Sequence, residues 1–268
     1  AEYEDKAPVQ ANVLKALEEA PMTVSELAAE LGKDKGQISR ACSSLSDAYK
    51  ITRMITLLCA LFIFLSVSTV LLLRFFNPPF TSFMVSESNF FQRKIDYSWT
   101  PISNMGENIA LSVVATEDSN FCNHLGLDIK EIYKVITRKE KRGASTITQQ
   151  LAKNLFLWSG RSWSRKIIEL YFTFLIEIII PKRRILEIYL NTVETSLLTF
   201  GVNQASDKYY KKPANQLSKE QSVRIALTLP NPKTRSPKNL KSNLTERISQ
   251  LKKDINILKK DDRSSCFL

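Results

Sequence analysis

Glycine and histidine are scarce in this chain, whose 268 residues include 7 glycines and one histidine. Neither a GxGxxG nor a GxxxxGK[ST] pattern occurs, which disfavours the glycine-rich loops that bind phosphate in nucleotide-binding folds. The low glycine content favours helices instead. The four cysteines are scattered and share no CxxC spacing. With a single histidine beside them, we expect neither a His/Cys zinc site nor a disulfide framework.

Charge is absent from one long stretch near the N-terminus. Residues 54–73 are twenty consecutive residues without a charged side chain, bracketed by Arg53 and Arg74. This is the length needed to cross a bilayer core as a helix, and a buried core helix is rarely apolar on every face for so long. We therefore predict a transmembrane anchor over residues 50–76. It begins too late for an ordinary cleaved signal peptide, and the Asn-Pro-Pro that follows ends the helix.

The whole chain has a net charge of +11, and this positive charge is unevenly spread. Residues 1–49 hold 5 Lys/Arg and 9 Asp/Glu, a net of −4, so the remainder holds 33 basic and 18 acidic residues, a net of +15. A strongly basic body beside a membrane anchor suits anionic lipid headgroups or a phosphorylated substrate. Nucleic acid and a plainly solvated basic surface are the alternative explanations.

The acidic segment before the anchor has the pattern of three short helices, because apolar residues recur at helical spacing over residues 12–45. Thr23 is the expected N-cap of the second helix, with Glu26 at the capping-box position, and Gly32 ends that helix. The pattern resembles the helix-turn-helix of winged-helix regulators, whose later helix enters the major groove of DNA. Its acidic balance is opposite to the usual DNA-binding footprint. We predict that residues 1–49 are a helix-turn-helix-like cytoplasmic extension or fused segment. The chain begins with Ala rather than Met, so we expect it not to be a complete natural start.

The single histidine lies in the stretch EDSNFCNHLG. Glu117, Phe121 and His124 fall at i, i+4 and i+7, so a continuous helix would place them on one face. Apolar residues precede Glu117, and a carboxylate held by a mostly apolar helix can have its pKa raised toward that of a useful base. By itself, the Glu117–Asp118 pair fits a helix-terminal acidic pair on the surface equally well. We expect His124 to fix the helix end and the turn at Gly126 by hydrogen bonding.

A second stretch, GASTITQQLAKNLFLWSGRSW, combines a polar and an apolar helix face. Ser145, Gln149 and Lys153 are spaced by four and are predicted to share one face, with Gln150 on the adjacent strip. A polar face is usually only solvated. Adjacent glutamines and hydroxyl residues nevertheless suit the recognition of hydroxyl and amide groups, as on a sugar.

Further along the chain, Arg165 and Glu169 lie one helical turn apart and can pair. Pro181 separates their helix from the next one. The very apolar run over residues 170–180 is either core or a surface that dips into lipid. Residues 244–260 space their apolar side chains by three and four and predict an amphipathic helix.

These stretches, followed by KRRILEIYLN and LPNP, occur in the order typical of the peptidoglycan glycosyltransferase family. Over residues 95–235 the chain resembles most closely the monofunctional biosynthetic peptidoglycan transglycosylases of Gram-negative bacteria. The resemblance implies a mainly α, lysozyme-like catalytic domain with a second, membrane-associated lobe. We assign this glycosyltransferase domain to residues 77–240, followed by an amphipathic C-terminal helix and tail over residues 241–268. Residues 194–206 depart from the family in being poor in glycine, although Gly201 remains.

The resemblance implies polymerisation of lipid II into glycan strands by inverting glycosyl transfer, with a β-1,4 linkage and release of undecaprenyl diphosphate. It makes Glu117 the general base and Glu169 the second essential carboxylate, which we expect to position Arg165 or another cation. The diphosphate would be held by Lys153 and Arg161. The other residues that it implies near the site are Ser145, Gln149, Gln150, Arg165 and Lys166 along the cleft, and Asp118, Phe121, His124 and Gly126 as its structural neighbours. No cofactor is evident, and dependence on Mg or Mn stays open without support from a ligand cluster.

The resemblance also implies a single-pass protein of the bacterial cytoplasmic (inner) membrane with its catalytic domain on the periplasmic side. The expected partners are lipid II, the growing lipid-linked glycan chain, the membrane, and cell-wall synthesis or division proteins; nucleic acid is not expected. One alternative is a membrane-tethered helix-turn-helix regulator, with residues 1–49 as the reader. Another is a lytic cell-wall enzyme on the same lysozyme-like fold, which would need an acid in the cleft and has no use for cations at Lys153 and Arg161.

Overall fold

The computed structural model of the chain describes residues 9–137, 144–160 and 162–268, and these residues are mainly helical. The chain divides into two compact units, one up to Ser66 and one from Val67 onward. The prediction of a mainly α protein is confirmed.

The first unit consists of α1 (Val9–Glu19), α2 (Val24–Glu30) and the beginning of α3 (Lys35–Phe75). Its small core is formed by buried apolar side chains from all three helices: Val13, Ala16, Leu27, Ile38 and Ala41. Thr23 caps α2 as predicted, since its side chain accepts from the Glu26 backbone N–H and the Glu26 carboxylate accepts from the Thr23 N–H at 2.7 Å. Gly32 follows α2 with a φ of 58°, a conformation that glycine adopts without strain.

Helix α3 differs from the prediction of a short third helix followed by a separate anchor, because it runs without a break over 41 residues. The physical reason lies in the sequence: no glycine or proline occurs between Gly36 and Pro78, so nothing interrupts the backbone hydrogen bonds. Among the described residues, α3 is the one helix that is long and apolar enough to cross a membrane, with a mean hydropathy of 2.6 in its most apolar window. It ends before the Pro-Pro pair, as expected.

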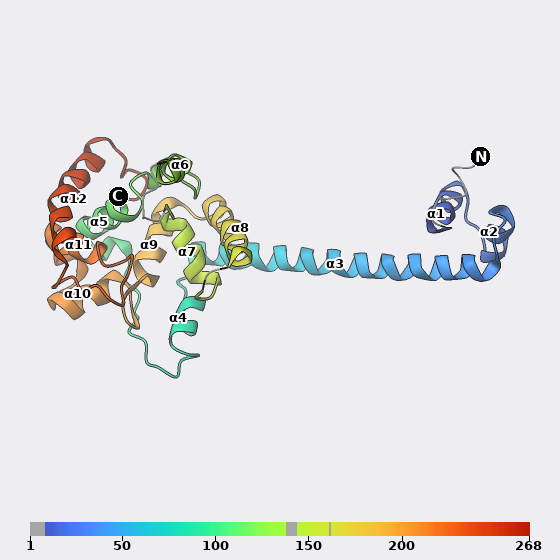
Figure 1. Cartoon of the computed structure of the whole chain (residues 1–268). Coiled ribbons are helices and arrows are strands. Elements are labelled where there is room, and N and C mark those ends of the chain that lie inside the picture. Colours follow the sequence, from blue (N-terminus) through green and yellow to red (C-terminus); the bar gives the residue numbers. More distant parts are fainter. Residues whose placement is uncertain (1–8, 138–143, 161) are drawn as a thin grey trace. The chain divides into compact units, whose positions relative to one another are not determined.

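The second unit contains the end of α3 and all later elements, and the colours of Figure 1 follow them along the sequence. Its α-helices are α4 (Ser82–Glu87), α5 (Glu107–Glu117), α6 (Ile129–Thr137), α7 (Ile147–Phe156), α8 (Trp163–Ile179), α9 (Lys182–Thr192), α10 (Val202–Tyr210), α11 (Lys219–Ala226) and α12 (Ser242–Lys260). Short 3-10 turns lie at η2 (Ile102–Asn104), η3 (Phe121–Asn123) and η4 (Ala214–Gln216). Pro181 separates α8 from α9, as predicted.

Helix α5 forms the centre of the second unit. Six consecutive residues, from Ile109 to Val114, are buried, as expected for a helix that is apolar on all sides. Helices α11 and α12 pack against it, and Figure 1 shows the three lying beside one another. The amphipathic helix predicted for residues 244–260 is confirmed, because Ile248, Leu251 and Ile255 of α12 are buried in the same core. The central helix therefore carries its last residue, Glu117, on a rigid support.

Residues 194–206, predicted as an atypical loop, begin with an antiparallel hairpin of β1 (Glu194–Ser196) and β2 (Thr199–Phe200). Leu198 turns the chain with a φ of 55°. Gly201 has a φ of 94°, and a Cβ atom there would lie 2.9 Å from the Asn191 carbonyl oxygen. The single glycine therefore stands where the backbone requires one.

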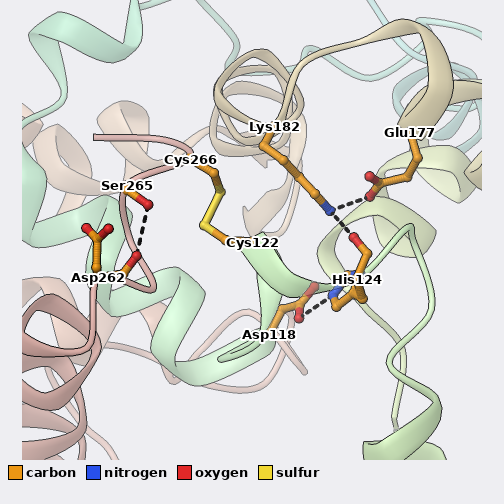
Figure 2. The surroundings of a disulfide bond; sticks show 8 residues. All are labelled: Asp118, Cys122, His124, Glu177, Lys182, Asp262, Ser265 and Cys266. Carbon is orange, nitrogen blue, oxygen red and sulfur yellow. Dashed lines mark hydrogen bonds and ion pairs between the residues drawn. A yellow bond between two sulfur atoms is a disulfide. The ribbon is translucent and has the colours of Figure 1, made fainter.

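A disulfide joins Cys122 and Cys266, whose Cα atoms are 5.7 Å apart although 144 positions separate them in the sequence. The prediction of no disulfide framework is therefore wrong for this pair. The spacing of cysteines along the chain does not determine their distance in the folded protein. Here the chain that follows α12 returns to η3, which contains Cys122. Figure 2 shows the bond beside Asp118 and His124. Cys42 and Cys59 are free thiols.

Candidate active site

Glu117 is the last residue of α5, and the helix does not continue through the EDSNFCNHLG stretch. Asp118 leaves the helical region with a φ of −161° and a ψ of 71°, and the next three residues of regular structure form the 3-10 turn η3. The prediction that Glu117, Phe121 and His124 share one helix face is therefore wrong. The buried Asp118 carboxylate explains the break, because it accepts a hydrogen bond from the Ile147 backbone N–H at 2.9 Å and ties the chain to the start of α7.

The hydrogen bonds predicted for His124 are present. Its Nδ1 accepts from the Gly126 backbone N–H at 3.1 Å, so the ring proton is on Nε2, which donates to Asp118 Oδ1 at 2.8 Å (Figure 2). Gly126 has a φ of 85°, and a Cβ atom there would lie 2.6 Å from a methyl carbon of Thr173. Phe121 is fully buried next to this loop. His124 thus holds the turn that follows Glu117.

The Glu117 carboxylate is held by Gln150, whose Nε2 donates to Oε2 at 2.8 Å. The other oxygen, Oε1, has no hydrogen-bond partner among the described residues. Burial raises the pKa of this carboxyl above its ordinary value, the Gln150 hydrogen bond lowers it, and the neighbouring Asp118 charge raises it further. One oxygen of a carboxylate with a raised pKa therefore remains available to accept a proton.

Helix α7 begins at Ile147, two residues later than a helix face that includes Ser145 requires. Thr146 is the N-cap, and Gln149 completes a capping box by accepting from the Thr146 N–H at 3.0 Å. Ser145 lies before the helix and is exposed, whereas the Gln149 side chain is buried at the helix start. The prediction that Ser145, Gln149 and Lys153 share one helix face is therefore wrong for Ser145, which precedes the N-cap, whereas Gln149 and Lys153 lie four residues apart within α7. Gln150 is the one that reaches Glu117.

Lys153 is a partly buried cation one turn after Gln150 on α7. Its Nζ lies 5.3 Å from the centre of the Phe83 ring, which suits a cation–π contact. Burial lowers the pKa of its ammonium group, while the carboxylates of Glu169 and Glu194 raise it. Within the described residues, no hydrogen bond or ion pair of this ammonium group is formed. Among the described residues, Lys153 is therefore a desolvated cation without an anionic partner at hydrogen-bonding distance.

Glu169 lies buried on α8 and holds two cations. Arg165 Nη1 donates to its Oε2 at 2.9 Å, and the Lys166 ammonium group pairs with Oε1. The pairing of Arg165 with Glu169 is therefore confirmed. Arg165 Nε is buried and without a hydrogen-bond partner in the described structure, so this guanidinium has a further N–H to offer.

Helix α7 connects the carboxylate to the cations. Gln150 and Lys153 are three residues apart on this helix, so their Cβ atoms are about 5–6 Å apart. The first contacts Glu117, and the second is influenced electrostatically by Glu169, Arg165 and Lys166. One helix thus carries both a contact to the proton acceptor and a cation that belongs to a charged cluster, which suits a transfer reaction at a carbon that carries an anionic leaving group.

Comparison with known proteins agrees with this chemistry. Residues 85–256 match the family model described as Transglycosylase. The chain belongs to this family. It is 40% identical over 202 residues to the biosynthetic peptidoglycan transglycosylase of Pasteurella multocida (strain Pm70), a match that covers 71% of this chain and 81% of the relative. With the biosynthetic peptidoglycan transglycosylase of Pseudomonas syringae pv. syringae (strain B728a) it shares 40% identity over 206 residues, 74% of this chain and 87% of the relative.

Outside the transglycosylase match, residues 7–48 match the model of the bacterial regulatory proteins of the arsR family. This match agrees with the helix-turn-helix-like pattern predicted for the N-terminal segment.

Two residues of this transglycosylase site were missed by sequence reasoning. Glu194 of β1 is buried, burial raises the pKa of its carboxyl, and Lys233 and Lys153 lower it. It is the single charged residue over positions 188–206, and an isolated charge in such a stretch could have marked it as a candidate site residue. Tyr189 of α9 is fully buried, and its hydroxyl donates to Gln150 Oε1 at 2.8 Å. Nothing in the sequence indicates this contact.

Arg161, predicted to hold the diphosphate, lies outside the residues that the structure describes. Across residues 9–137, 144–160 and 162–268, no group of three or more His, Cys, Asp or Glu side chains could hold a metal ion. The cations identified in the site are therefore Lys153, Arg165 and Lys166.

Proposed function

We propose that this transglycosylase polymerises lipid II into the glycan strands of peptidoglycan, forming β-1,4 linkages with inversion and releasing undecaprenyl diphosphate. The observation that carries the proposal is that α7 joins two kinds of group: Gln150 contacts the Glu117 carboxylate, and Lys153, three residues later, lies within electrostatic range of Glu169, Arg165 and Lys166. The names of the relatives, biosynthetic peptidoglycan transglycosylases, support the same substrate class.

In this reaction Glu117 acts as the general base. The attacking group is a sugar hydroxyl, a poor nucleophile, so its proton must be taken as the new bond forms. Burial raises the pKa of the Glu117 carboxyl, which makes it a better proton acceptor than an exposed glutamate. The Gln150 hydrogen bond occupies Oε2, so Oε1 receives the proton.

The cations act on the leaving group. A lipid diphosphate is already a weak base, so its departure needs charge neutralisation rather than a proton. Lys153 has no ion-pair partner among the described residues, and Arg165 has an unused buried Nε. Glu169 holds Arg165 and Lys166 in place. A lytic enzyme would instead need an acid to protonate the bridging oxygen, a task for which these cations are unsuited.

The chain is anchored in the bacterial inner membrane by α3, with the catalytic unit on the periplasmic side and residues 1–49 in the cytoplasm. The length and hydropathy of α3 support the anchor. The Cys122–Cys266 disulfide supports the orientation, because disulfides persist in the periplasm and are rare in the reducing cytoplasm. Proteins of cell-wall synthesis or division are the partners expected there.

The proposal is tested by measuring glycan-chain formation from purified lipid II by the detergent-solubilised full chain and its Glu117→Gln variant. The variant keeps the shape of the side chain and loses the base, so we expect at least a ~100-fold loss of rate. Glu246→Gln, a substitution of an exposed glutamate on α12, is the matched control and should keep the wild-type rate. Normal polymerisation by Glu117→Gln would overturn the assignment.

A second candidate function, DNA binding by residues 7–48, is favoured by their match to the arsR family. The acidic balance of this segment opposes it. A gel-shift experiment with the solubilised full chain separates the two outcomes. Binding that weakens steeply between low and physiological salt would support a DNA contact, and no shift at low salt would exclude one.

A further inference from the structure

We propose that Tyr189 is a positioning residue for the general base: its hydroxyl fixes the orientation of the Gln150 amide, so that the amide NH2 always faces Glu117. The inference rests on the proposed function, since it concerns the group that takes the proton in that reaction. Tyr189 itself would touch neither donor nor acceptor sugar.

Three helices contribute one side chain each to the hydrogen-bonded series Tyr189–Gln150–Glu117, which we call the relay. The Tyr189 hydroxyl on α9 donates to Gln150 Oε1 on α7 at 2.8 Å, and Gln150 Nε2 donates to Glu117 Oε2 on α5, also at 2.8 Å. Tyr189 is fully buried, so water does not compete for its hydroxyl. Each hydrogen bond has an ordinary length, and together they connect the core of the unit to the reacting carboxylate.

The direction of the relay follows from the chemistry of the groups. A glutamine amide can present either its NH2 or its carbonyl to a neighbour, and only the NH2 stabilises an ionised carboxylate. The tyrosine hydroxyl remains a donor because burial and the charges of Glu117 and Asp118 raise its pKa well above the ordinary value. With that donor in place, the carbonyl of Gln150 must face Tyr189 and the NH2 must face Glu117. Without it, the amide is free to turn its carbonyl toward the carboxylate.

The relay therefore sets the proton affinity of Glu117. Burial raises the pKa of the carboxyl, and the Gln150 hydrogen bond is the main influence that lowers it. The other charged or titratable groups that act on Glu117 are Asp118, which raises its pKa, Arg235 and Arg247, which lower it, and the neutral Tyr189. Removing the Tyr189 hydroxyl leaves these charges in place and weakens only the hydrogen bond.

The experiment is the pH dependence of lipid II polymerisation by the solubilised full chain carrying Tyr189→Phe. The substitution keeps the buried ring, so the fold is retained, which a thermal melt checks. We expect the acid limb of kcat to move upward by about one pH unit, with KM for lipid II unchanged. Tyr97→Phe is the matched control, because the Tyr97 hydroxyl donates to the Pro78 carbonyl oxygen at 2.6 Å, away from Glu117. Its acid limb should stay at the wild-type pH.

Gln150→Met tests the same relay from its middle. It should shift the acid limb in the same direction, and the double variant with Tyr189→Phe should shift it no further than Gln150→Met alone. An acid limb at the wild-type pH in either single variant would overturn the inference while leaving the proposed function intact, provided Glu117→Gln is inactive. Wild-type activity of Glu117→Gln would instead overturn the proposed function.

Discussion

His124 Nε2 donates to Asp118 Oδ1 at 2.8 Å, and both side chains are almost completely buried. The second oxygen of the same carboxylate accepts from the Ile147 N–H at the start of α7. Asp118 therefore joins the loop after the catalytic helix to the helix that carries Gln150 and Lys153. The hydrogen bonds of His124 thus hold the loop in place, and in the proposed reaction Glu117 rather than His124 takes the proton.

His124→Gln is expected to keep partial activity. The glutamine NH2 can still donate to Asp118, but the acceptor for the Gly126 N–H is lost, so the turn loosens. We expect a rate about tenfold below that of the wild type, the usual consequence of losing one hydrogen bond of ~1.4 kcal/mol. Polymerisation of lipid II by this variant and by Glu117→Gln should be measured side by side. Equal losses in the two variants would show that His124 takes part in the proton transfer.

Glu117→Gln is expected to make the fold more stable at neutral pH. Burial raises the pKa of the Glu117 carboxyl above its ordinary value of 4.5, so the folded state favours the protonated form. The stability that this proton supplies is fully present below pH 4.5 and is lost as the pH rises through the raised pKa. The glutamine variant has no such loss. Its melting temperature should exceed that of the wild type by a few degrees, on the order of 1 kcal/mol, at pH 7 and match it at pH 4. A constant difference across this range would contradict the prediction.

Lys153 is expected to set the alkaline limit of activity and to capture the donor. Burial lowers the pKa of its ammonium group, so the charge is lost at a lower pH than for an exposed lysine. Lys153→Arg should move the alkaline limb of the rate profile upward, because a guanidinium stays charged. Lys153→Ala should raise KM for lipid II at least ~10-fold. Lys253→Ala, on the exposed side of α12, is the control; an unchanged KM in Lys153→Ala would argue against the diphosphate role.

Reducing the disulfide is expected to destabilise the catalytic unit. The bond closes a loop across 144 positions, and its removal should cost about 2–5 kcal/mol. The variant Cys122→Ser/Cys266→Ser should melt at a lower temperature than the wild type and no longer respond to reductant. Cys42→Ser/Cys59→Ser, which removes the free thiols, should respond to reductant as the wild type does. Identical melting curves with and without reductant in the wild type would contradict the prediction.

Local features were predictable from the sequence because neighbouring residues determine them. The capping box at Thr23 and the Arg165–Glu169 pair each depend on residues three or four positions apart. The same reasoning failed where a side chain made a hydrogen bond that the local helical pattern does not include. Asp118 ended α5 because its carboxylate had a partner on α7, and the Thr146 capping box occupied Gln149.

Contacts between distant residues were not predictable from one sequence. Tyr189 and Gln150 are 39 positions apart, and Cys122 and Cys266 are 144 apart, so no spacing rule relates the members of either pair. Glu194 is buried within the electrostatic range of Lys153 and Lys233 because the fold brings these three distant positions together. The resemblance to a family supplied Glu117, Lys153, Glu169 and Gln150, but neither Glu194 nor Tyr189, whose hydroxyl contacts Gln150.

The disulfide also imposes an order of events during synthesis. Cys122 emerges from the ribosome well before Cys266, with α6 to α12 still to be made. Throughout that interval it is an unpaired thiol five residues after the proposed base, open to wrong pairing or oxidation. The correct bond needs Cys266 to reach Cys122, so it can form only once α12 has been made, and it then ties the chain after that helix to η3.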